Sequence, residues 1–399
     1  MIGAGAAALA VAEGLRRGGH GDGIVLVGAE AHLPYDRPPL SKHVLRGDWP
    51  AERAALRPAD TYERLGVEVR TGVRAVSLDT GRRLLALDDG SRLPYGALVV
   101  ATGVRPRSLP GGEGIDGVHG LRTLDDALAL RRRLAGRPRL VVVGGGFIGA
   151  EAAAVARELN CDVTLVTNRA VLLADALGVR IGGLLARLHQ ERGVRIEAGV
   201  PVAAVVHDGH RATGVRLADG RLVAADAVLV GIGSLPNTDW LAGSGVPVGD
   251  GVLCDATLRA ADGVWAAGDV ASWPDPAAGG RLRIEHRTNA AEQGLTVAHN
   301  LLAAPGEAAA FTTVPYVWTD QYHLKLQIYG RTRGADRLRI VEGSPDEGKF
   351  TALYGRDGRV VAALGVDMPR ALRTLRPLVA TPTPWPTPWP DAVPVPGGG

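Results

Sequence analysis

The chain has 399 residues, of which 46% are hydrophobic, so it can bury two or three cores of ordinary size. Its formal net charge of +3 is too mild to indicate a nucleic-acid-binding protein, although it suits an acidic protein partner. No apolar stretch reaches the ~20 residues that span a bilayer, and the first residues do not resemble a secretory signal. We therefore expect a cytoplasmic protein that binds neither nucleic acid nor membrane.

The two cysteines, Cys161 and Cys254, lie far apart in the sequence and form no C-x-x-C pair. This spacing argues against a redox-active dithiol, a disulfide framework or a zinc ribbon, and it favours two buried thiols. His207 and His210 flank Asp208 in a polar turn without an indicated third ligand, so we expect a solvated loop there. The sequence predicts no metal site.

Short apolar runs are followed by glycine-rich turns and then by alanine-rich helical stretches, which is typical of α/β architecture. One such block begins at Met1, and a second, internally similar block begins at Arg139. After Phe311 the residues alternate, which predicts strands at 324–328, 337–341, 350–354 and 360–366 and a helix at 368–378. The Pro-rich end, 381–399, is expected to be extended and disordered, and a ligand for a proline-recognition domain is the less favoured alternative.

The first glycine motif, Gly3-Ala4-Gly5-Ala6-Ala7-Ala8, matches G-x-G-x-x-A, in which backbone N–H groups approach a pyrophosphate at the start of a helix. Residues 6–17 supply that helix and residues 24–27 a strand, and Glu30 then follows, placed to accept hydrogen bonds from an adenosine ribose. Only Met1 and Ile2 precede Gly3, whereas the fold needs a strand of about five residues there. Either the true start lies upstream, or the first strand is truncated, and a truncated strand would loosen or abolish binding of the nucleotide.

The second glycine motif, 144–149, matches G-x-G-x-x-G between an apolar strand at 140–143 and a helix at 150–159, with another strand at 162–166. Two such units in one chain predict two dinucleotides, and a flavin with a hydride carrier is the usual pair.

Thr167-Asn168-Arg169 stands at the end of the second strand of that unit, where NAD-selective sites usually place a carboxylate. No acidic residue is present there to repel a 2′-phosphate, and Arg169 could pair with one, which favours NADPH over NADH. The alternative is an Arg169 that points to solvent.

Further segments match a known pattern together: 33–42 (LPYDRPPLSK), 101–103, 121–123, 144–151, 233–237, 266–270, 285–293 and 318–321. In this order they resemble the putidaredoxin and rubredoxin reductases and the reductase components of aromatic-ring dioxygenases, over roughly residues 1–380. The resemblance implies an FAD-dependent NAD(P)H oxidoreductase. Such an enzyme passes electrons to a ferredoxin-type iron–sulfur protein that serves a monooxygenase or dioxygenase.

The resemblance also implies two Rossmann-like domains and a small C-terminal α+β domain. The FAD-binding domain would comprise residues 1–110 and 235–310, and the NAD(P)-binding domain residues 111–234. The interface domain would comprise residues 311–380, before the tail at 381–399. A monomer or a homodimer is expected.

Carried over onto this chain, the resemblance assigns Glu30 to the adenosine ribose of FAD, Arg37 to its phosphates or ribose, and Asp269 to its ribityl hydroxyls. A helix N-cap is the alternative role for Asp269. Arg122 would meet the cofactor where the chain crosses between domains. The remaining expected cofactor-binding residues are Gly3, Gly5, Ala7, Ala8, Ala75, Ala101, Thr102, Gly103, Gly144, Gly146, Phe147, Ile148, Gly149, Thr167, Asn168, Arg169, Gly233, Gly268, Glu285, His286 and Arg287.

Three residues are expected at the reacting centre by the same resemblance. Lys42 would lie near the flavin and pair with Glu151, which follows the second glycine motif. Lys42 could instead be a surface lysine, and Glu151 could serve only as first-turn charge on its helix. Trp318 would lie near the flavin on the side of the electron acceptor, either as an electron conduit or as a packing ring.

The chain departs from the family pattern in three places. Arg287 stands where a tryptophan or apolar residue is frequent, Thr167 replaces an acidic residue of NADH-using relatives, and the first strand is short. Arg370, Arg373 and Arg376 recur on the predicted C-terminal helix, where they form either a basic face for an acidic ferredoxin or a solvated face.

Two other functions remain open at this point. One is direct reduction of a small organic or quinone acceptor, and the other is redox sensing, as in apoptosis-inducing factor. The absence of a C-x-x-C pair disfavours disulfide and peroxide reduction.

Overall fold

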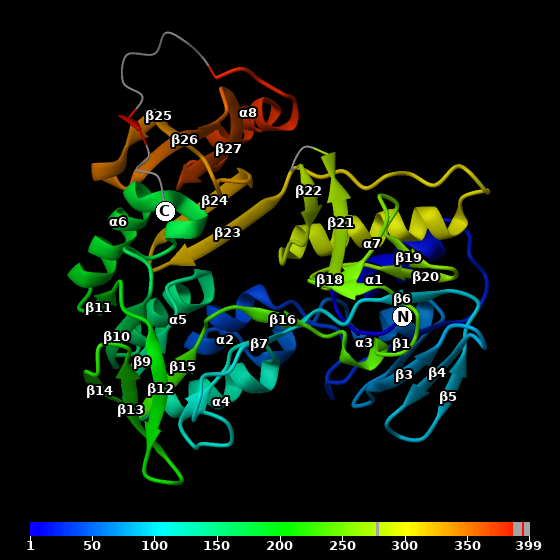
Figure 1. Cartoon of the computed structure of the whole chain (residues 1–399), viewed down its shortest axis with the longest axis horizontal. Coiled ribbons are helices and arrows are strands. Elements are labelled where there is room, and N and C mark those ends of the chain that lie inside the picture. The colour runs from blue at the N-terminus through cyan, green and yellow to red at the C-terminus, as the bar shows by residue number, and fades with distance from the viewer. Residues whose placement is uncertain (277–278, 386–392, 395–399) are drawn as a thin grey trace. The chain divides into compact units, whose positions relative to one another are not determined.

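The computed structural model describes residues 1–276, 279–385 and 393–394. The chain folds into two compact units, and its course can be followed in Figure 1. The first unit comprises Met1–Arg37, Ala51–Arg105 and Ser234–Thr313. The second comprises Pro38–Pro50, Pro106–Gly233 and Val314–Gly399. Helices and strands mix in both units, so the predicted α/β class is confirmed.

The first unit contains a parallel sheet into which the start of the chain is built. Strand β1 (Ile24–Val27) pairs with β2 (Val67–Arg70), and β6 (Leu98–Val100) pairs with β20 (Val264–Ala266). Ile2 bridges these two pairs, because it is a parallel partner of both Val27 and Val100. Its N–H donates to the carbonyl of Val99 at 2.9 Å. The expected short first strand is therefore present as one bridging residue, and this residue joins the two halves of the sheet.

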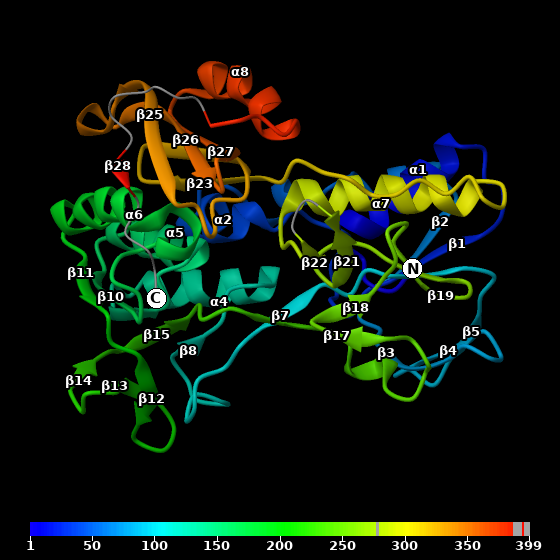
Figure 2. The ribbon, with the colours of Figure 1, turned by 45° about the horizontal axis from the view of Figure 1, so that its top comes forward.

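Small residues bring two helices of the first unit close together. Helix α1 (Ala6–Arg17) packs against α7 (Arg287–Leu302), and Figure 2 shows the two side by side. A Cβ on Gly14 would lie only 2.6 Å from that of Ala298, and a Cβ on Gly294 only 2.6 Å from the carbonyl oxygen of Ala7. Glycines at these positions therefore permit the close approach. Helix α1 follows the first glycine motif directly, so this packing fixes the direction in which its N-terminus points.

The rest of the first unit consists of short elements around the same core. The antiparallel strands are β3 (Ala75–Asp79), β4 (Leu84–Leu87), β5 (Arg92–Pro94), β17 (Val248–Gly249), β18 (Gly251–Leu253), β19 (Arg259–Ala261) and β22 (Gly280–Leu282). Strand β21 (Ala271–Asp275) pairs in parallel with β18. The helical turns are η2 (Ala51–Ala54), α3 (Ala59–Arg64) and η3 (Asp239–Leu241). Trp273 is the largest fully buried side chain of this core.

The second unit contains a five-stranded parallel sheet in the order β11-β10-β9-β15-β8. These strands are β11 (Arg195–Ala198), β10 (Asp162–Thr167), β9 (Arg139–Val143), β15 (Ala227–Val230) and β8 (Val118–His119). The helices of this part are α4 (Leu124–Leu134), α5 (Phe147–Glu158) and α6 (Ala174–Glu191), with η1 (Pro38–Ser41) and α2 (His43–Arg46). The predicted strands at 140–143 and 162–166 and the helix after the second glycine motif are confirmed.

Two smaller sheets complete this region of the chain. Strands β12 (Val202–His207), β13 (Ala212–Leu217) and β14 (Leu222–Ala224) form an antiparallel sheet. Strand β7 (Val104–Pro106) pairs with β16 (Ser234–Pro236), where the chain passes from one unit to the other.

An antiparallel sheet follows in the order β23-β24-β27-β26-β25-β28. Its strands are β23 (Tyr316–Gln321), β24 (Leu324–Gly330), β25 (Arg337–Ser344), β26 (Lys349–Arg356), β27 (Arg359–Val366) and β28 (Val393–Pro394), with the turn η5 (Pro345–Glu347). Helix α8 (Pro369–Ala380) packs on β27 and β24. The four predicted strands and the predicted helix are confirmed. Strand β23 has no counterpart among the predicted strands.

The first residues of the expected disordered tail are ordered, so the prediction of disorder from residue 381 is wrong for 381–385. Trp385 is 5% exposed, and its N–H donates to the carbonyl of Gly358 at 2.7 Å. A Cβ on Gly355 would lie 2.5 Å from the Trp385 ring, so the indole rests directly on that glycine. Burial of this large ring outweighs the tendency of the prolines to keep the segment extended. Residues 386–392 and 395–399 lie outside the described residues.

Candidate functional site

The first glycine motif forms a tight turn whose shape depends on glycine. Gly3 has φ +104°, and a Cβ there would lie 2.1 Å from the carbonyl oxygen of Ala101. Gly5 is the N-cap of α1, so no side chain bonds the first-turn amides, and a Cβ there would meet nothing within 4 Å. Ala7 and Ala8 face the core. Open space before uncapped amides is the arrangement that a pyrophosphate requires.

Glu30 lies in a cluster with two neighbours from the following loop. Nη2 of Arg37 donates to Oε1 of Glu30 at 2.7 Å, and the hydroxyl of Tyr35 donates to Oε2. Burial disfavours the charge on Arg37, but Tyr35, Glu30 and Asp269 outweigh this effect and raise its pKa. The cluster places the Arg37 guanidinium and the Glu30 carboxylate in the unit that carries the first glycine motif. Tyr35 also belongs to it, although it was not among the residues predicted from the sequence.

Residues 101–103 are tied to the segment after β16. The hydroxyl of Thr102 donates to the carbonyl of Asn237 at 2.8 Å, and the Asn237 amide donates to the carbonyl of Thr102 at 3.0 Å. The N–H of Asn237 also donates to the carbonyl of Gly103, which has φ +64°. Ala75 lies in β3, paired with Leu87.

Gly268 and Asp269 precede β21, so the predicted alternative of Asp269 as a helix N-cap is wrong. The N–H of Gly268 donates to Oε1 of Gln293 at 2.7 Å, which holds this turn against α7. The carbonyl of Asp269 accepts from Arg283 at 3.0 Å. The Asp269 side chain is half-buried in the same unit as Glu30.

Three predicted residues with different partners lie where the chain enters α7. Glu285 accepts from Ser234 and from Arg283, and Nε of Arg287 donates to Asp36. Nδ1 of His286 is buried without a hydrogen-bond partner among the described residues, and burial lowers the pKa of this histidine. The departure at Arg287 is thus accommodated by an ion pair. His286 leaves one buried ring nitrogen available to a bound group.

The second glycine motif repeats the geometry of the first. Gly144 has φ +116°, and a Cβ there would lie 2.1 Å from the carbonyl oxygen of Gly231. Gly146 is the N-cap of α5 and faces open space. A Cβ on Gly149 would lie 2.0 Å from the carbonyl oxygen of Gly144, so this glycine permits close packing of helix and strand. Phe147 is partly exposed and Ile148 is 42% exposed.

Arg169 projects from the loop after β10. Its N–H donates to Oγ1 of Thr167 at 3.2 Å, and its Nε pairs with Oδ2 of Asp175 at 3.0 Å. Asn168 is exposed. The Arg169 side chain is 53% exposed, as the solvent-directed alternative expects, and Asp175 on α6 pairs with its guanidinium.

Two predicted residues lie at chain turns of the second unit. Gly233 has φ +101°, and its carbonyl accepts from the N–H of Arg107 at 3.0 Å. The N–H of Arg122 donates to Asp126, which also closes a capping box with Thr123 at the start of α4.

Lys42 and Glu151 form a buried ion pair, with Nζ 2.7 Å from Oε2. The same Oε2 accepts from the hydroxyl of Ser41 at 2.5 Å, and Oε1 accepts from the hydroxyl of Thr319 at 2.6 Å. The alternative of a surface lysine is therefore wrong. Trp318, next to Thr319 on β23, is half-buried and stacks on Tyr316 with ring centroids 5.8 Å apart.

Ser41 and Thr319 were not identified as site residues, although both lie inside quoted motifs. Their role depends on contacts with Glu151 over 110 and 168 positions of the chain, which one sequence does not reveal.

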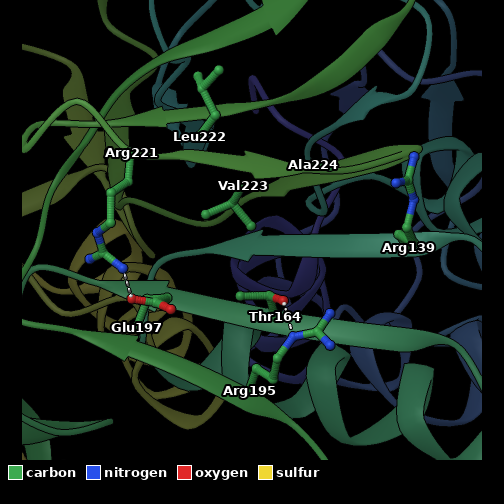
Figure 3. Close-up of a pocket in the computed structure, with 8 residues that line it drawn as sticks. All are labelled: Arg139, Thr164, Arg195, Glu197, Arg221, Leu222, Val223 and Ala224. Carbon is green, nitrogen blue, oxygen red and sulfur yellow. Dashed lines mark hydrogen bonds and ion pairs between the residues drawn. The ribbon is translucent and has the colours of Figure 1, made fainter.

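A surface pocket of about 520 Å³ lies elsewhere in the second unit (Figure 3). Arg139 and Thr164 place it toward the amino ends of β9 and β10, whereas the second glycine motif follows the carboxyl end of β9. The lining arginines are already paired: Arg139 with Asp226, Arg195 with Asp162, and Arg221 with Glu197. Because ligands of parallel α/β sheets bind at the carboxyl ends of the strands, this pocket is not the nucleotide site.

In the described residues the cysteines form no disulfide, and neither a metal-binding cluster nor a membrane-spanning helix is present. Cys161 and Cys254 are free and buried, and burial raises the pKa of each thiol, to about 12 for Cys254. Within the same residues, no group of three or more His, Cys, Asp or Glu side chains is arranged to hold a metal ion. None of the helices in the described ranges is long and apolar enough to cross a membrane.

Comparison with known proteins gives consistent matches over nearly the whole chain. Residues 1–294 match the family model for pyridine nucleotide-disulphide oxidoreductases, and residues 316–387 match the model for the reductase C-terminal domain. The ferredoxin–NAD(+) reductase component of the anthranilate 1,2-dioxygenase system of Burkholderia cepacia is 41% identical, over 95% of this chain and 93% of its own length. A ferredoxin–NAD(P)(+) reductase of a Sphingomonas species is 37% identical, over 91% of this chain and 87% of its own length.

A solved structure shows the same fold. The covalent complex of putidaredoxin reductase with putidaredoxin contains a chain with a TM-score of 0.89 and 34% identity, covering 95% of this chain and 91% of that one. The chain therefore belongs to the pyridine nucleotide-disulphide oxidoreductase family and carries a reductase C-terminal domain.

Proposed function

We propose that this protein is an FAD-containing reductase that passes electrons from NAD(P)H to a ferredoxin-type iron–sulfur protein serving an oxygenase. The observation that carries the proposal is the pair of glycine turns, one in each unit, each with a positive-φ first glycine and an uncapped helix start. Both buried cysteines are kept protonated by their raised pKa values, so disulfide chemistry has no nucleophile here.

The residues of the first unit fit FAD. Gly3 and Gly5 leave the space that a pyrophosphate needs, and His286 offers a buried ring nitrogen that the described residues leave without a hydrogen bond. When bound, FAD accepts a hydride and releases electrons singly, which is the chemistry that an iron–sulfur acceptor requires. The residues of this unit proposed to hold it are Gly3, Gly5, Ala7, Ala8, Glu30, Arg37, Ala75, Ala101, Thr102, Gly103, Gly268, Asp269, Glu285, His286 and Arg287. Arg122 belongs to the second unit and is proposed as a further cofactor-binding residue on the family resemblance alone.

The second unit fits a nicotinamide dinucleotide. Gly144, Gly146 and Gly149 form the pyrophosphate turn, with Phe147 and Ile148 on the following helix and Gly233 at the neighbouring turn. Thr167, Asn168 and Arg169 would meet the adenosine ribose. Because Arg169 is a cation in the exposed loop and no acidic residue accompanies it at 167–169, we favour NADPH.

Lys42 and Glu151 supply a buried charge pair in the second unit, and Trp318 lies beside Thr319, a partner of Glu151. In this proposal Lys42 presents its ammonium to the flavin and Glu151 fixes where that ammonium lies. Trp318 faces the side of the acceptor. These residues bind, orient and polarise, and none needs to act as a nucleophile.

The proposed domains are an FAD-binding domain at 1–110 and 235–310, an NAD(P)-binding domain at 111–234 and an interface domain at 311–380. We place the protein in the cytoplasm, where both nicotinamide dinucleotides are supplied. A monomer or a homodimer would serve this function equally.

The experiment is an anaerobic absorbance titration of the FAD-loaded protein with NADPH and, separately, with NADH. Rapid bleaching of the flavin band by either, followed by reoxidation when a ferredoxin is added, is the expected result. If the reduced flavin were reoxidised rapidly by a quinone but by no ferredoxin, the result would contradict the proposal and indicate direct reduction of a small acceptor. A protein that retains no FAD would contradict it.

A further inference from the structure

A continuous chain of hydrogen bonds leads away from Glu151 through the second unit. Thr319 donates to Oε1 of Glu151 at 2.6 Å, and Nε2 of Gln321 donates to Oγ1 of Thr319 at 3.3 Å. Nε2 of His189 lies 3.0 Å from Oε1 of Gln321, and the hydroxyl of Tyr322 lies 3.1 Å from Nδ1 of His189. Thr319, Gln321 and His189 are fully buried, so their polar side-chain atoms are shielded from solvent and hydrogen-bond to one another.

The direction of each donor in this chain can be derived from chemistry. Oε1 of Gln321 can only accept, so Nε2 of His189 must carry the proton. Burial lowers the pKa of His189, so the ring is neutral at physiological pH and its Nδ1 is an acceptor. Burial raises the pKa of Tyr322, so its hydroxyl remains protonated and donates to Nδ1. Every link therefore donates towards Glu151.

The opposite order of donors is incompatible with an ionised Glu151. If the Gln321 amide were turned over, Oε1 of Gln321 would accept from Thr319, and the Thr319 oxygen would face the Glu151 oxygen as a second acceptor. That contact becomes favourable only when Glu151 carries a proton. In this reversed order Nε2 of His189 would accept from the Gln321 amide. The proton of His189 would then lie on Nδ1 and be donated to the Tyr322 hydroxyl oxygen. The net change at equilibrium is one proton gained by Glu151.

We propose that His189 is a positioning residue that acts through Gln321 and Thr319 to hold Glu151 ionised and directed at Lys42, so that the tautomer of His189 and the charge of Glu151 change together. Its significance for electron transfer rests on the function proposed above, because Lys42 is the group that would meet the flavin. Aligned donors polarise one another, so the effect on the carboxylate exceeds that of the Thr319 hydroxyl alone.

Among the described residues, few charged side chains lie near Glu151 and Tyr322, the two ends of this series of hydrogen bonds. Glu151 is met by the Lys42 ammonium and the Ser41 hydroxyl from the η1–α2 segment and by Thr319 from β23. At the other end, Arg192 lies over the Tyr322 ring at 5.1 Å, and Arg157 and Glu158 act on the Tyr322 phenol electrostatically.

The test uses nuclear magnetic resonance of the FAD-loaded full chain with ¹⁵N-labelled histidine and ¹³C-carboxyl-labelled glutamate. Glu151→Gln identifies the Glu151 signal. At about pH 7 we expect His189 to be protonated at Nε2 only. A proton on Nδ1 in the unchanged protein would overturn the proposal, whatever the flavin does.

Thr319→Val is the decisive variant, because it keeps the shape of the side chain and removes the donor to Glu151. At about pH 7 we expect the ¹³C signal of the Glu151 carboxyl to move towards that of a protonated carboxyl, because the carboxylate loses a hydrogen-bond donor. Tyr322→Phe, at the half-buried end, should cause a smaller shift in the same direction. Thr351→Val is the matched control, since Thr351 is equally buried and its hydroxyl has no hydrogen-bond partner among the described residues.

The outcomes separate this inference from the proposed function. Equal Glu151 carboxyl signals in Thr319→Val and Thr351→Val would refute the coupling, even if NADPH reduces the flavin normally. A shifted Glu151 signal in a protein that does not reduce ferredoxin would support the coupling and refute the proposed function.

Discussion

Nζ of Lys42 lies 2.7 Å from Oε2 of Glu151, although only 8% and 4% of their side chains are exposed. Each charge is stable in the interior because the other neutralises it, so removing one leaves the other uncompensated. We expect Glu151→Gln to lower the free energy of unfolding by about 3 kcal/mol or more, measured by urea unfolding of the FAD-loaded protein. The double variant Lys42→Met/Glu151→Leu should lose less, because it buries no charge. The reverse order of stabilities would contradict this account.

Gly5 gives a test of FAD binding that leaves the fold intact. A Cβ there meets nothing within 4 Å, so Gly5→Ala should fold normally but obstruct a pyrophosphate at the start of α1. We expect FAD affinity to fall by about tenfold or more, measured by fluorescence titration of the FAD-free protein. Gly21→Ala is the control, because it adds the same methyl group in open space beyond the other end of α1. Equal FAD affinity in the two variants would place the pyrophosphate elsewhere.

Arg169 and Asp175 should set the preference between the two nicotinamide dinucleotides. Asp175 competes with a 2′-phosphate for the Arg169 guanidinium, and exposed pairs of this kind contribute about 0.2–1 kcal/mol. Asp175→Asn should therefore tighten NADPH binding up to about fivefold without changing that of NADH. Arg169→Gln should weaken NADPH binding by about tenfold or more.

Binding of both dinucleotides is measured by calorimetry on the oxidised protein. Arg180→Gln, which removes an exposed cation from α6, controls for a general electrostatic effect. If Arg169→Gln weakened NADH and NADPH equally, Arg169 would not contact the 2′-phosphate.

The three arginines of α8 remain a predicted docking face. Arg370, Arg373 and Arg376 are all exposed, while Leu372 on the opposite side of the helix is buried. Reversing the three charges to Glu should slow reduction of an acidic ferredoxin by about tenfold at low salt, with the difference vanishing above about 0.5 M salt. Reduction of ferricyanide, a small acceptor, should not change.

Arg92→Glu, at an exposed position of β5, is the control for net charge. A ferredoxin reduction rate that does not depend on salt in the unchanged protein would show that the arginines of α8 form only a solvated face.

Burial of His189 should make the protein less stable in acid. Its pKa is lowered in the fold, so the unfolded chain binds more protons and stability rises with pH. The contribution is complete above about pH 6.5, the unfolded value, and is lost as the pH falls towards the lowered folded value. Between these two pKa values, His189→Gln should flatten the slope by up to about 1.4 kcal/mol per pH unit. Urea unfolding at several pH values measures this, and an unchanged slope in His189→Gln would contradict it.

Much of the fold follows from local sequence. Strand, glycine turn and helix are adjacent in each dinucleotide motif, so the spacing alone predicts α1 and α5. Lys42 and Glu151 were predicted from the resemblance of their segments to the reductase family. The alternating residues after Phe311 predict four strands because one face of each packs against a core.

What the sequence did not reveal depends on contacts over long separations. Strand β23 was missed although its pairing with β24 is continuous, because its buried residues include Thr319 and Gln321, which bond to polar partners and break the alternation of apolar and polar residues. The pairing of Arg169 with Asp175 and of Arg287 with Asp36 likewise appears only when the chain is folded.

Trp385 has a consequence for how this protein can be shortened. The indole covers Gly355, and backbone bonds from Trp385 to Gly358 and from Val360 to Thr383 hold the segment along β27. A recombinant chain that stopped after α8 would therefore uncover an apolar face of the C-terminal sheet that includes Leu353 and Val360. A safe boundary for truncation thus lies beyond residue 385, inside the proline-rich sequence.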